Sequence, residues 1–202
     1  GIGCELDVVP CEGWCRDHYY DACHLPWVMP SPNMPTLDTA LVYPGMCLLE
    51  GTNLSEGRGT TRPFELFGAP FIDGRALALE LGRYDLSGVL FRPCVIEPTF
   101  HKFARQRCGA LQLHVMDRLA FNSFRTGLAV LIAVRKLWPD ELAWRTQPYE
   151  FRDDVPAIDL LTGNVAVREA IDGGESLDTV SEIASSGTQA YDAGRAKALL
   201  YD

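Results

Sequence analysis

The residues best able to do chemistry are concentrated between Glu50 and Phe64. This run reads Glu-Gly-Thr-Asn-Leu-Ser-Glu-Gly-Arg-Gly-Thr-Thr-Arg-Pro-Phe and brings carboxylates, hydroxyls, an amide and two guanidiniums close together. Its three glycines permit positive φ and a close approach of the backbone to a ligand. Because loops carried by a rigid scaffold often hold functional residues, we expect a small-molecule site here rather than a linker.

Four carboxylates are candidates for acid–base chemistry: Glu50, Glu56, Glu97 and Asp117. Glycoside hydrolysis typically uses two carboxyl groups, one of which its surroundings keep protonated. Sequence spacing does not fix the separation of any pair, and a single glutamate is also typical of a surface charge or a cap. Glu50 differs because it follows an apolar run, 46–49, and precedes a glycine, so we expect it at a loop mouth. It is the catalytic candidate of this chain.

Guanidinium and amide groups supply the binding candidates. Arg58 lies between two glycines, which suits delivery of its fork to a carboxylate or to sugar hydroxyls. The alternative is a salt bridge that braces the loop through Glu50 or Glu56. Asn33 and Asn53 offer both a donor and an acceptor, as sugar hydroxyls require, but each is also typical of a turn.

One histidine is placed by strand alternation. In the predicted strand 110–116, His114 faces away from Leu111 and Leu113. With Asp117 three residues on, it is either a hydrogen-bonded site histidine or a structural histidine in a half-buried strand.

Composition excludes several classes of partner. The net charge of −9 disfavours nucleic acid, which requires a basic face. The longest apolar run, 128–134, is too short for a membrane span. Phosphate-loop, dinucleotide-loop and nucleophile-elbow motifs are absent from the sequence, so we expect no cofactor.

The seven cysteines contain no Cys-x-x-Cys pair. Cys11 and Cys15 have a spacing that zinc ligands can use, and His18, Cys23 and His24 follow them, but no second pair completes a zinc pattern. A local metal site or disulfide is the alternative to free thiols that pack as small apolar groups. We expect free thiols and no metal.

Periodicity predicts an α+β fold, or an α/β fold with a small mixed sheet. The predicted strands are 6–10, 88–94 and 110–116, and the predicted helices are 36–42, 74–81, 123–137, 166–171, 177–184 and 188–200. We expect Thr36 to cap its helix, Pro44-Gly45 to end it, and Pro139 to end the longest helix. The chain has no initiator methionine and opens on strand-like residues, so we expect upstream sequence to be missing.

Several longer motifs resemble one family. They are Trp27-Val-Met-Pro-Ser-Pro-Asn33-Met-Pro-Thr36, Tyr43-Pro-Gly45, Glu50-Gly-Thr-Asn53 with Ser55, Gly57-Arg-Gly-Thr60, Pro63-Phe64, Gly68-Ala-Pro70, Phe91-Arg-Pro93, Pro98-Thr-Phe100, His114-x-x-Asp117 and Arg195 with Leu199-Leu-Tyr201. Across nearly the whole chain these look like the bacterial exo-β-N-acetylmuramidases of the NamZ type, glycosidases that remove terminal N-acetylmuramic acid from peptidoglycan fragments.

The resemblance implies a hydrolase of peptidoglycan recycling with two domains, in which an N-terminal Rossmann-like domain supplies the proposed catalytic glutamate. Residues 1–202 then form a single C-terminal, cleft-forming domain, inactive without its partner domain. Matching motif positions imply substrate contacts at Asn33, Glu50, Thr52, Asn53, Arg58, Arg62 and His114. The lactyl carboxylate of muramic acid gives a reason for Arg58 or Arg62.

Two alternatives stay open. In the first, the chain is a non-catalytic carbohydrate-binding or assembly module. In the second, it is a complete small hydrolase that uses Glu50 with Glu56 or Glu97. The expected partners are a muropeptide or amino-sugar substrate and the N-terminal domain of the same protein, with neither nucleic acid nor a membrane span. Substrates of this kind indicate the cell envelope or secretion, whereas unpatterned cysteines suit the cytoplasm.

Overall fold

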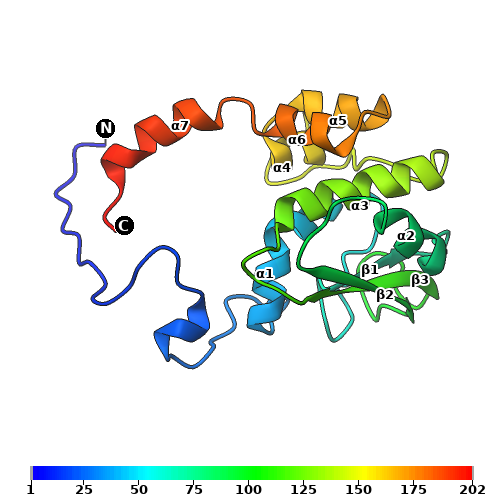
Figure 1. The fold of residues 1–202 in the computed structure, drawn as a ribbon, viewed down its shortest axis with the longest axis horizontal. Coiled ribbons are helices and arrows are strands. Elements are labelled where there is room, and N and C mark those ends of the chain that lie inside the picture. Colours follow the sequence, from blue (N-terminus) through cyan, green and yellow to red (C-terminus); the bar gives the residue numbers. More distant parts are fainter. Residues whose placement is uncertain (1, 202) are drawn as a thin grey trace. The chain divides into compact units, whose positions relative to one another are not determined.

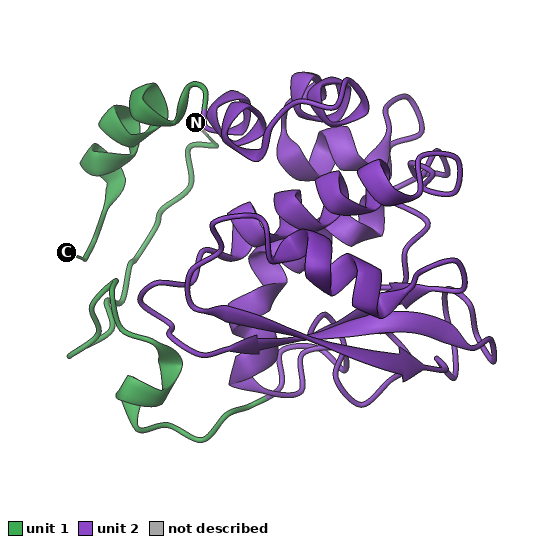
Figure 2. Ribbon diagram, turned by 45° about the vertical axis from the view of Figure 1, so that its right-hand side comes forward, with its two compact units in different colours: residues 1–28, 186–202 green, residues 29–185 purple. Residues whose placement is uncertain are grey.

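A computed structural model describes residues 2–201, which divide into two compact units (Figure 2). The larger unit comprises residues 29–185. The smaller unit combines residues 2–28 with 186–201. All the candidate site residues lie in the larger unit, and each unit is described by itself.

The larger unit contains one antiparallel sheet in the order β1-β3-β2. Its strands are β1 (Leu66–Ala69), β2 (Val89–Ile96) and β3 (Cys108–Val115). In the central strand β3, Leu111 and Leu113 are buried, whereas Gln112 between them and His114 after them are half-buried. This alternation confirms the predicted facing of His114 and shows which side of the sheet covers the core.

Helices complete an α+β fold, as predicted. They are α1 (Leu37–Met46), η2 (Cys47–Gly51), α2 (Gly74–Leu81), α3 (Ser123–Leu137), α4 (Ala157–Thr162), α5 (Val165–Asp172) and α6 (Leu177–Ala184). Figure 1 shows α3 running between the sheet and the α4–α6 group. Its residues 126–134 are all buried, because a helix with neighbours on several sides is apolar all round. No helix in residues 2–201 is long and apolar enough to cross a membrane.

The close crossing of α1 and α3 corrects one prediction. Pro44-Gly45 does not end α1, which continues to Met46. The Ser123 hydroxyl donates to Val42 O at 2.7 Å and accepts from Gly45 N at 2.8 Å, so it replaces bonding that proline disrupts. A Cβ on Gly45 would lie 1.7 Å from Ser123 O, which shows that glycine is required here for helix contact.

Other predicted boundaries hold where local signals are strong. Helices 74–81, 123–137 and 177–184 match α2, α3 and α6, and Thr36 caps α1 by accepting from Thr39 N at 3.3 Å. The predicted helix 188–200 is shorter, with α7 (Thr188–Arg195) followed by η3 (Ala196–Ala198). β1 and α4 were not predicted.

The smaller unit contains α7, η3 and η1 (Tyr20–Cys23). The predicted strand 6–10 is wrong, since residues 2–28 contain no strand in the described structure. Leu6, Val8 and Val9 are exposed, so their apolar alternation meets no partner strand that could satisfy the backbone.

Candidate functional site

The glycine-rich loop is folded against the chain itself. Gly57 and Gly59 have φ of +77° and +82°, as a glycine-dependent loop requires. A Cβ on Gly57 would lie 2.2 Å from Leu66 O, and one on Gly59 would lie 2.7 Å from Phe100 N. At these two positions neighbouring backbone occupies the space that a side chain would need, so glycine is required for the fold of the loop.

Arg58 bridges two carboxylates of the same loop. Its Nη2 donates to Glu50 Oε1 at 2.7 Å, and its Nε donates to Glu56 Oε1 at 2.8 Å. The guanidinium also lies 5.1 Å from the ring of Phe64, a buried residue in the left-handed region at φ +64°. These contacts confirm the bracing salt bridge. Within residues 2–201, Nη1 of Arg58 has no hydrogen-bond partner, so its two donors stay free for a ligand.

Glu56 is the buried centre of this ion network. Its side chain is 0% exposed and faces Lys102 Nζ at 3.0 Å and His101 Nδ1 at 3.2 Å, in addition to Arg58. Burial alone would raise the pKa of Glu56, but the Lys102 charge and hydrogen bond outweigh it and lower the pKa. Lys102 also donates to Leu49 O and Leu54 O, at 3.1 and 2.9 Å.

Glu50 accepts two side-chain hydrogen bonds at the edge of the network. Its Oε2 accepts from the Tyr149 hydroxyl at 3.0 Å, while Oε1 accepts from Arg58. Burial, followed by the charge of Glu50, raises the pKa of Tyr149, so this phenol stays a donor. Both oxygens of Glu50 are therefore engaged by neighbouring side chains.

We expect Tyr149→Phe to lower the free energy of unfolding by about 1 kcal/mol, because it removes one hydrogen bond to a half-buried carboxylate. Chemical denaturation at pH 7 measures this. Tyr191→Phe, on an exposed side chain of α7, is the matched control and should change nothing. Equal stability of Tyr149→Phe and wild type would show that the bond contributes nothing.

A cavity of about 560 Å³ shares two residues with the ion network. We call it the Arg145 cavity. It is lined by Thr52, Asn53, His101, Lys102, Phe103, Ala143, Trp144, Arg145 and Gln147. Asn53 shapes its wall, because its amide donates to Glu141 O at 2.8 Å and accepts from Ala143 N at 3.1 Å. The Thr52 hydroxyl is likewise engaged, with Leu49 O at 2.9 Å and Leu54 N at 3.0 Å.

Arg62 and His114 line a second cavity of about 240 Å³, the Arg62 cavity. Arg62 Nη1 lies 3.0 Å from Glu65 Oε2 and 3.8 Å from Asp38 Oδ2, and both carboxylates line the same cavity. His114 Nε2 accepts from Arg92 Nε at 3.3 Å. The suggested partner of His114, Asp117, instead accepts from the backbone of the turn that follows β3.

Other candidates lie outside both cavities. Asn33 is half-buried in the segment before α1, where its backbone N donates to Ser31 Oγ at 3.3 Å. Glu97 and Asp117 are exposed and line neither cavity. The structure therefore gathers Thr52 and Asn53 at one cavity, Arg62 and His114 at the other, and Glu50 with Arg58 in the ion network.

Sequence reasoning missed the residues contributed from far along the chain. His101, Lys102, Trp144, Arg145 and Tyr149 complete the network and the Arg145 cavity. The only sequence signal was the polar segment 97–102 between two predicted strands. Nothing local connects it with Glu56, or connects Tyr149 with Glu50.

Comparison with known families explains the motif pattern. The family model described as "Exo-beta-N-acetylmuramidase NamZ, C-terminal" matches residues 41–201, and its N-terminal counterpart matches residues 1–38. The chain belongs to the NamZ family. The peptidoglycan beta-N-acetylmuramidase NamZ of Bacillus subtilis (strain 168) is 40% identical over 200 residues, which are 99% of this chain and 46% of that NamZ protein.

Two solved structures from Bacteroides fragilis NCTC 9343, both DUF1343 family proteins, share the fold of this NamZ-family chain. One has a TM-score of 0.80 at 25% identity and covers 94% of this chain and 49% of its own. The other has a TM-score of 0.70 at 24% identity, and the match covers 98% of this chain and 50% of that structure's chain. The chain thus spans about half the length of the relatives it matches.

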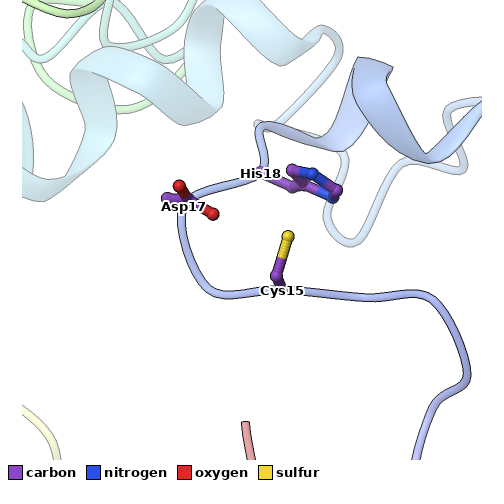
Figure 3. A group of neighbouring side chains, drawn as sticks. All are labelled: Cys15, Asp17 and His18. Atoms are coloured by element: carbon purple, nitrogen blue, oxygen red, sulfur yellow. The ribbon is translucent and has the colours of Figure 1, made fainter. Parts of the chain in front are cut away.

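The cysteine-containing segment of the smaller unit forms a separate group. Ligand atoms of Cys15, Asp17 and His18 lie within 4.8 Å of one another (Figure 3). Desolvation and then the Asp17 carboxylate raise the pKa of the Cys15 thiol, which disfavours the thiolate that binds a metal. All seven cysteines are free thiols in the structure.

Proposed function

We propose that this chain forms the substrate-binding part of an exo-acting glycosidase that releases terminal N-acetylmuramic acid from peptidoglycan fragments. The observation that carries the proposal is the NamZ match over residues 41–201, since the B. subtilis relative is named for this activity. The supporting geometry is a cavity of about 560 Å³, a size typical of small-molecule sites, whose lining includes Thr52 and Asn53 of the glycine-rich loop.

The proposed division of labour places the general acid in an N-terminal domain of the same protein. Glu50 supports this because both of its oxygens already accept hydrogen bonds, from Arg58 and Tyr149. Glu56 supports it because Arg58 and Lys102 pair with it and its pKa is lowered, which favours the ionised form. We propose that Asn33, Glu50, Thr52, Asn53, Arg58, Arg62 and His114 belong to the substrate wall, by direct contact or by shaping it.

A hydrolysis assay tests this division. We expect the 202-residue chain to hydrolyse a chromogenic N-acetylmuramide at least about 100-fold more slowly than the B. subtilis relative, the usual contribution of a positioned general acid. The separately produced N-terminal half of that relative should restore part of the rate. Rapid turnover by the chain alone would contradict a divided site. Failure of complementation, together with no binding of N-acetylmuramic acid, would favour an assembly module.

A further inference from the structure

The Arg145 cavity differs from the rest of this acidic chain in its charge. Its lining includes no carboxylate. Lys102 and His101 of the lining face the buried Glu56, which leaves Arg145 as the cation of the lining without a carboxylate partner among residues 2–201. The Arg62 cavity, by contrast, contains Asp38 and Glu65, which already balance its arginine. Anions are therefore favoured at the Arg145 cavity.

Arg145 is a half-buried arginine with no carboxylate partner within residues 2–201. Its Nη2 donates to Pro148 O at 2.9 Å, and its guanidinium lies 5.1 Å from the ring of Tyr149. Its backbone N donates to Gly51 O at 2.8 Å, which fixes the residue beside the loop. Nε and Nη1 have no partner among the described residues. The guanidinium is thus held in one orientation, while its Nε and Nη1 donors remain available to bind an anion.

His101 is a second oriented side chain on the same wall. Glu56 holds its Nδ1 at 3.2 Å, which leaves Nε2 without a partner in the described chain. His101 and Phe103 both adopt left-handed backbone, with φ of +71° and +55°. The half-buried Lys102 between them is fixed by three acceptors, so packing imposes this conformation. Strained residues of this kind concentrate at ligand sites.

We propose that the Arg145 cavity is an anion subsite, in which Arg145 binds the carboxylate of an acidic sugar beside His101, while Phe103 and Trp144 supply apolar walls. The inference rests on the proposed function for the identity of that sugar, N-acetylmuramic acid, whose lactyl group carries the carboxylate. Arg58 and Arg62 then have other roles, because their charges are already balanced by neighbouring glutamates.

Titrations followed by ¹H–¹⁵N NMR at pH 7 test the subsite with three probes: N-acetylmuramic acid, N-acetylglucosamine and D-lactate. N-acetylglucosamine lacks the lactyl group, and D-lactate is that group alone. We expect N-acetylmuramic acid to bind about tenfold more tightly than N-acetylglucosamine, the scale of one charge-assisted interaction. Shifts should concentrate at Asn53, Ala143 and the Trp144 indole.

Arg145→Gln should abolish the preference for N-acetylmuramic acid over N-acetylglucosamine and leave the binding of N-acetylglucosamine unchanged. Arg107→Gln is the matched control, since it removes a charge from an exposed arginine that lines neither cavity, and it should keep the full preference. His101→Gln should weaken the preference only partly. Unchanged melting temperatures verify that the variants are folded.

Persistence of the preference in Arg145→Gln, or binding of none of the probes to wild type, would overturn the subsite. The hydrolysis assay distinguishes this failure from failure of the proposed function. If hydrolysis is restored by complementation and Arg145→Gln still prefers N-acetylmuramic acid over N-acetylglucosamine, the subsite alone is rejected. Arg145-dependent binding without complemented hydrolysis would reject the glycosidase alone.

Discussion

Glu56→Gln should lower the free energy of unfolding by about 3–5 kcal/mol, the cost of removing one partner from a buried ion pair. The substitution keeps the size of the side chain but takes away the charge that Lys102, Arg58 and His101 face. Lys102, whose side chain is 19% exposed, is then left with two carbonyl acceptors and without its paired carboxylate. Urea denaturation at pH 7 measures the loss.

Glu80→Gln is the control for this experiment. Glu80 is also buried, but its partners Arg83 and Lys136 have side chains that are 71% and 57% exposed, so water can replace the ion pair. We expect a loss of about 1 kcal/mol or less. Adding Lys102→Met to Glu56→Gln should recover part of the stability, because the unpaired charge is gone. Equal losses for both glutamates would contradict the central role of Glu56.

The same carboxylate predicts a pH dependence. Because the fold lowers the pKa of Glu56 below its ordinary value of 4.5, its contribution is complete above that value and declines as the pH falls through the folded-state pKa. The stability difference between wild type and Glu56→Gln should therefore narrow in acid. A difference that stays constant down to about pH 3 would show that the fold does not lower the pKa of Glu56.

Gly45→Ala should cost more than about 3 kcal/mol, since the added methyl meets backbone that cannot move aside. The Cβ added at Gly45 would lie 1.7 Å from Ser123 O. On the facing helix, a Cβ added at Gly127 would likewise lie only 2.2 Å from Gly45 O. Helices α1 and α3 must then separate, which opens the core. Thermal unfolding measures the effect.

Gly82→Ala is the matched substitution. Gly82 ends α2 with an ordinary helical φ of −65°, and its virtual Cβ meets Ala78 O at 3.5 Å, a normal contact. We expect a change within about 0.5 kcal/mol. If Gly45→Ala were tolerated equally well, the two helices would not be in the close contact described.

Local chemistry made much of the fold predictable. Asn122 and Ser176 cap α3 and α6 through side-chain oxygens that accept from Arg125 N and Thr179 N, and both helices match their predicted bounds. Strand β3 followed from the alternation of buried leucines. Pro44-Gly45 was misread because glycine serves turns and close helix contacts alike, and only the partner helix distinguishes them.

Long-range pairing explains what the sequence did not reveal. Tyr149 meets Glu50 across 99 residues, and Asn53 meets Ala143 across 90. β1 is four residues long and forms only because β3 lies beside it. The bracing of Arg58 was predictable because Glu50 and Glu56 are close in sequence. The Arg145 cavity was not, since its walls come from three separate segments.

The segment that carries His101 is fastened to the loop at several points. Thr99 donates to Gly59 O from both its backbone N and its hydroxyl at 2.9 Å, and Lys102 spans from Leu49 to Glu56. This wall is consequently preorganised, so the binding of a ligand to it should cost little conformational entropy. Free and saturated forms of this wall should superimpose closely, and selectivity should arise mainly from dissociation rates.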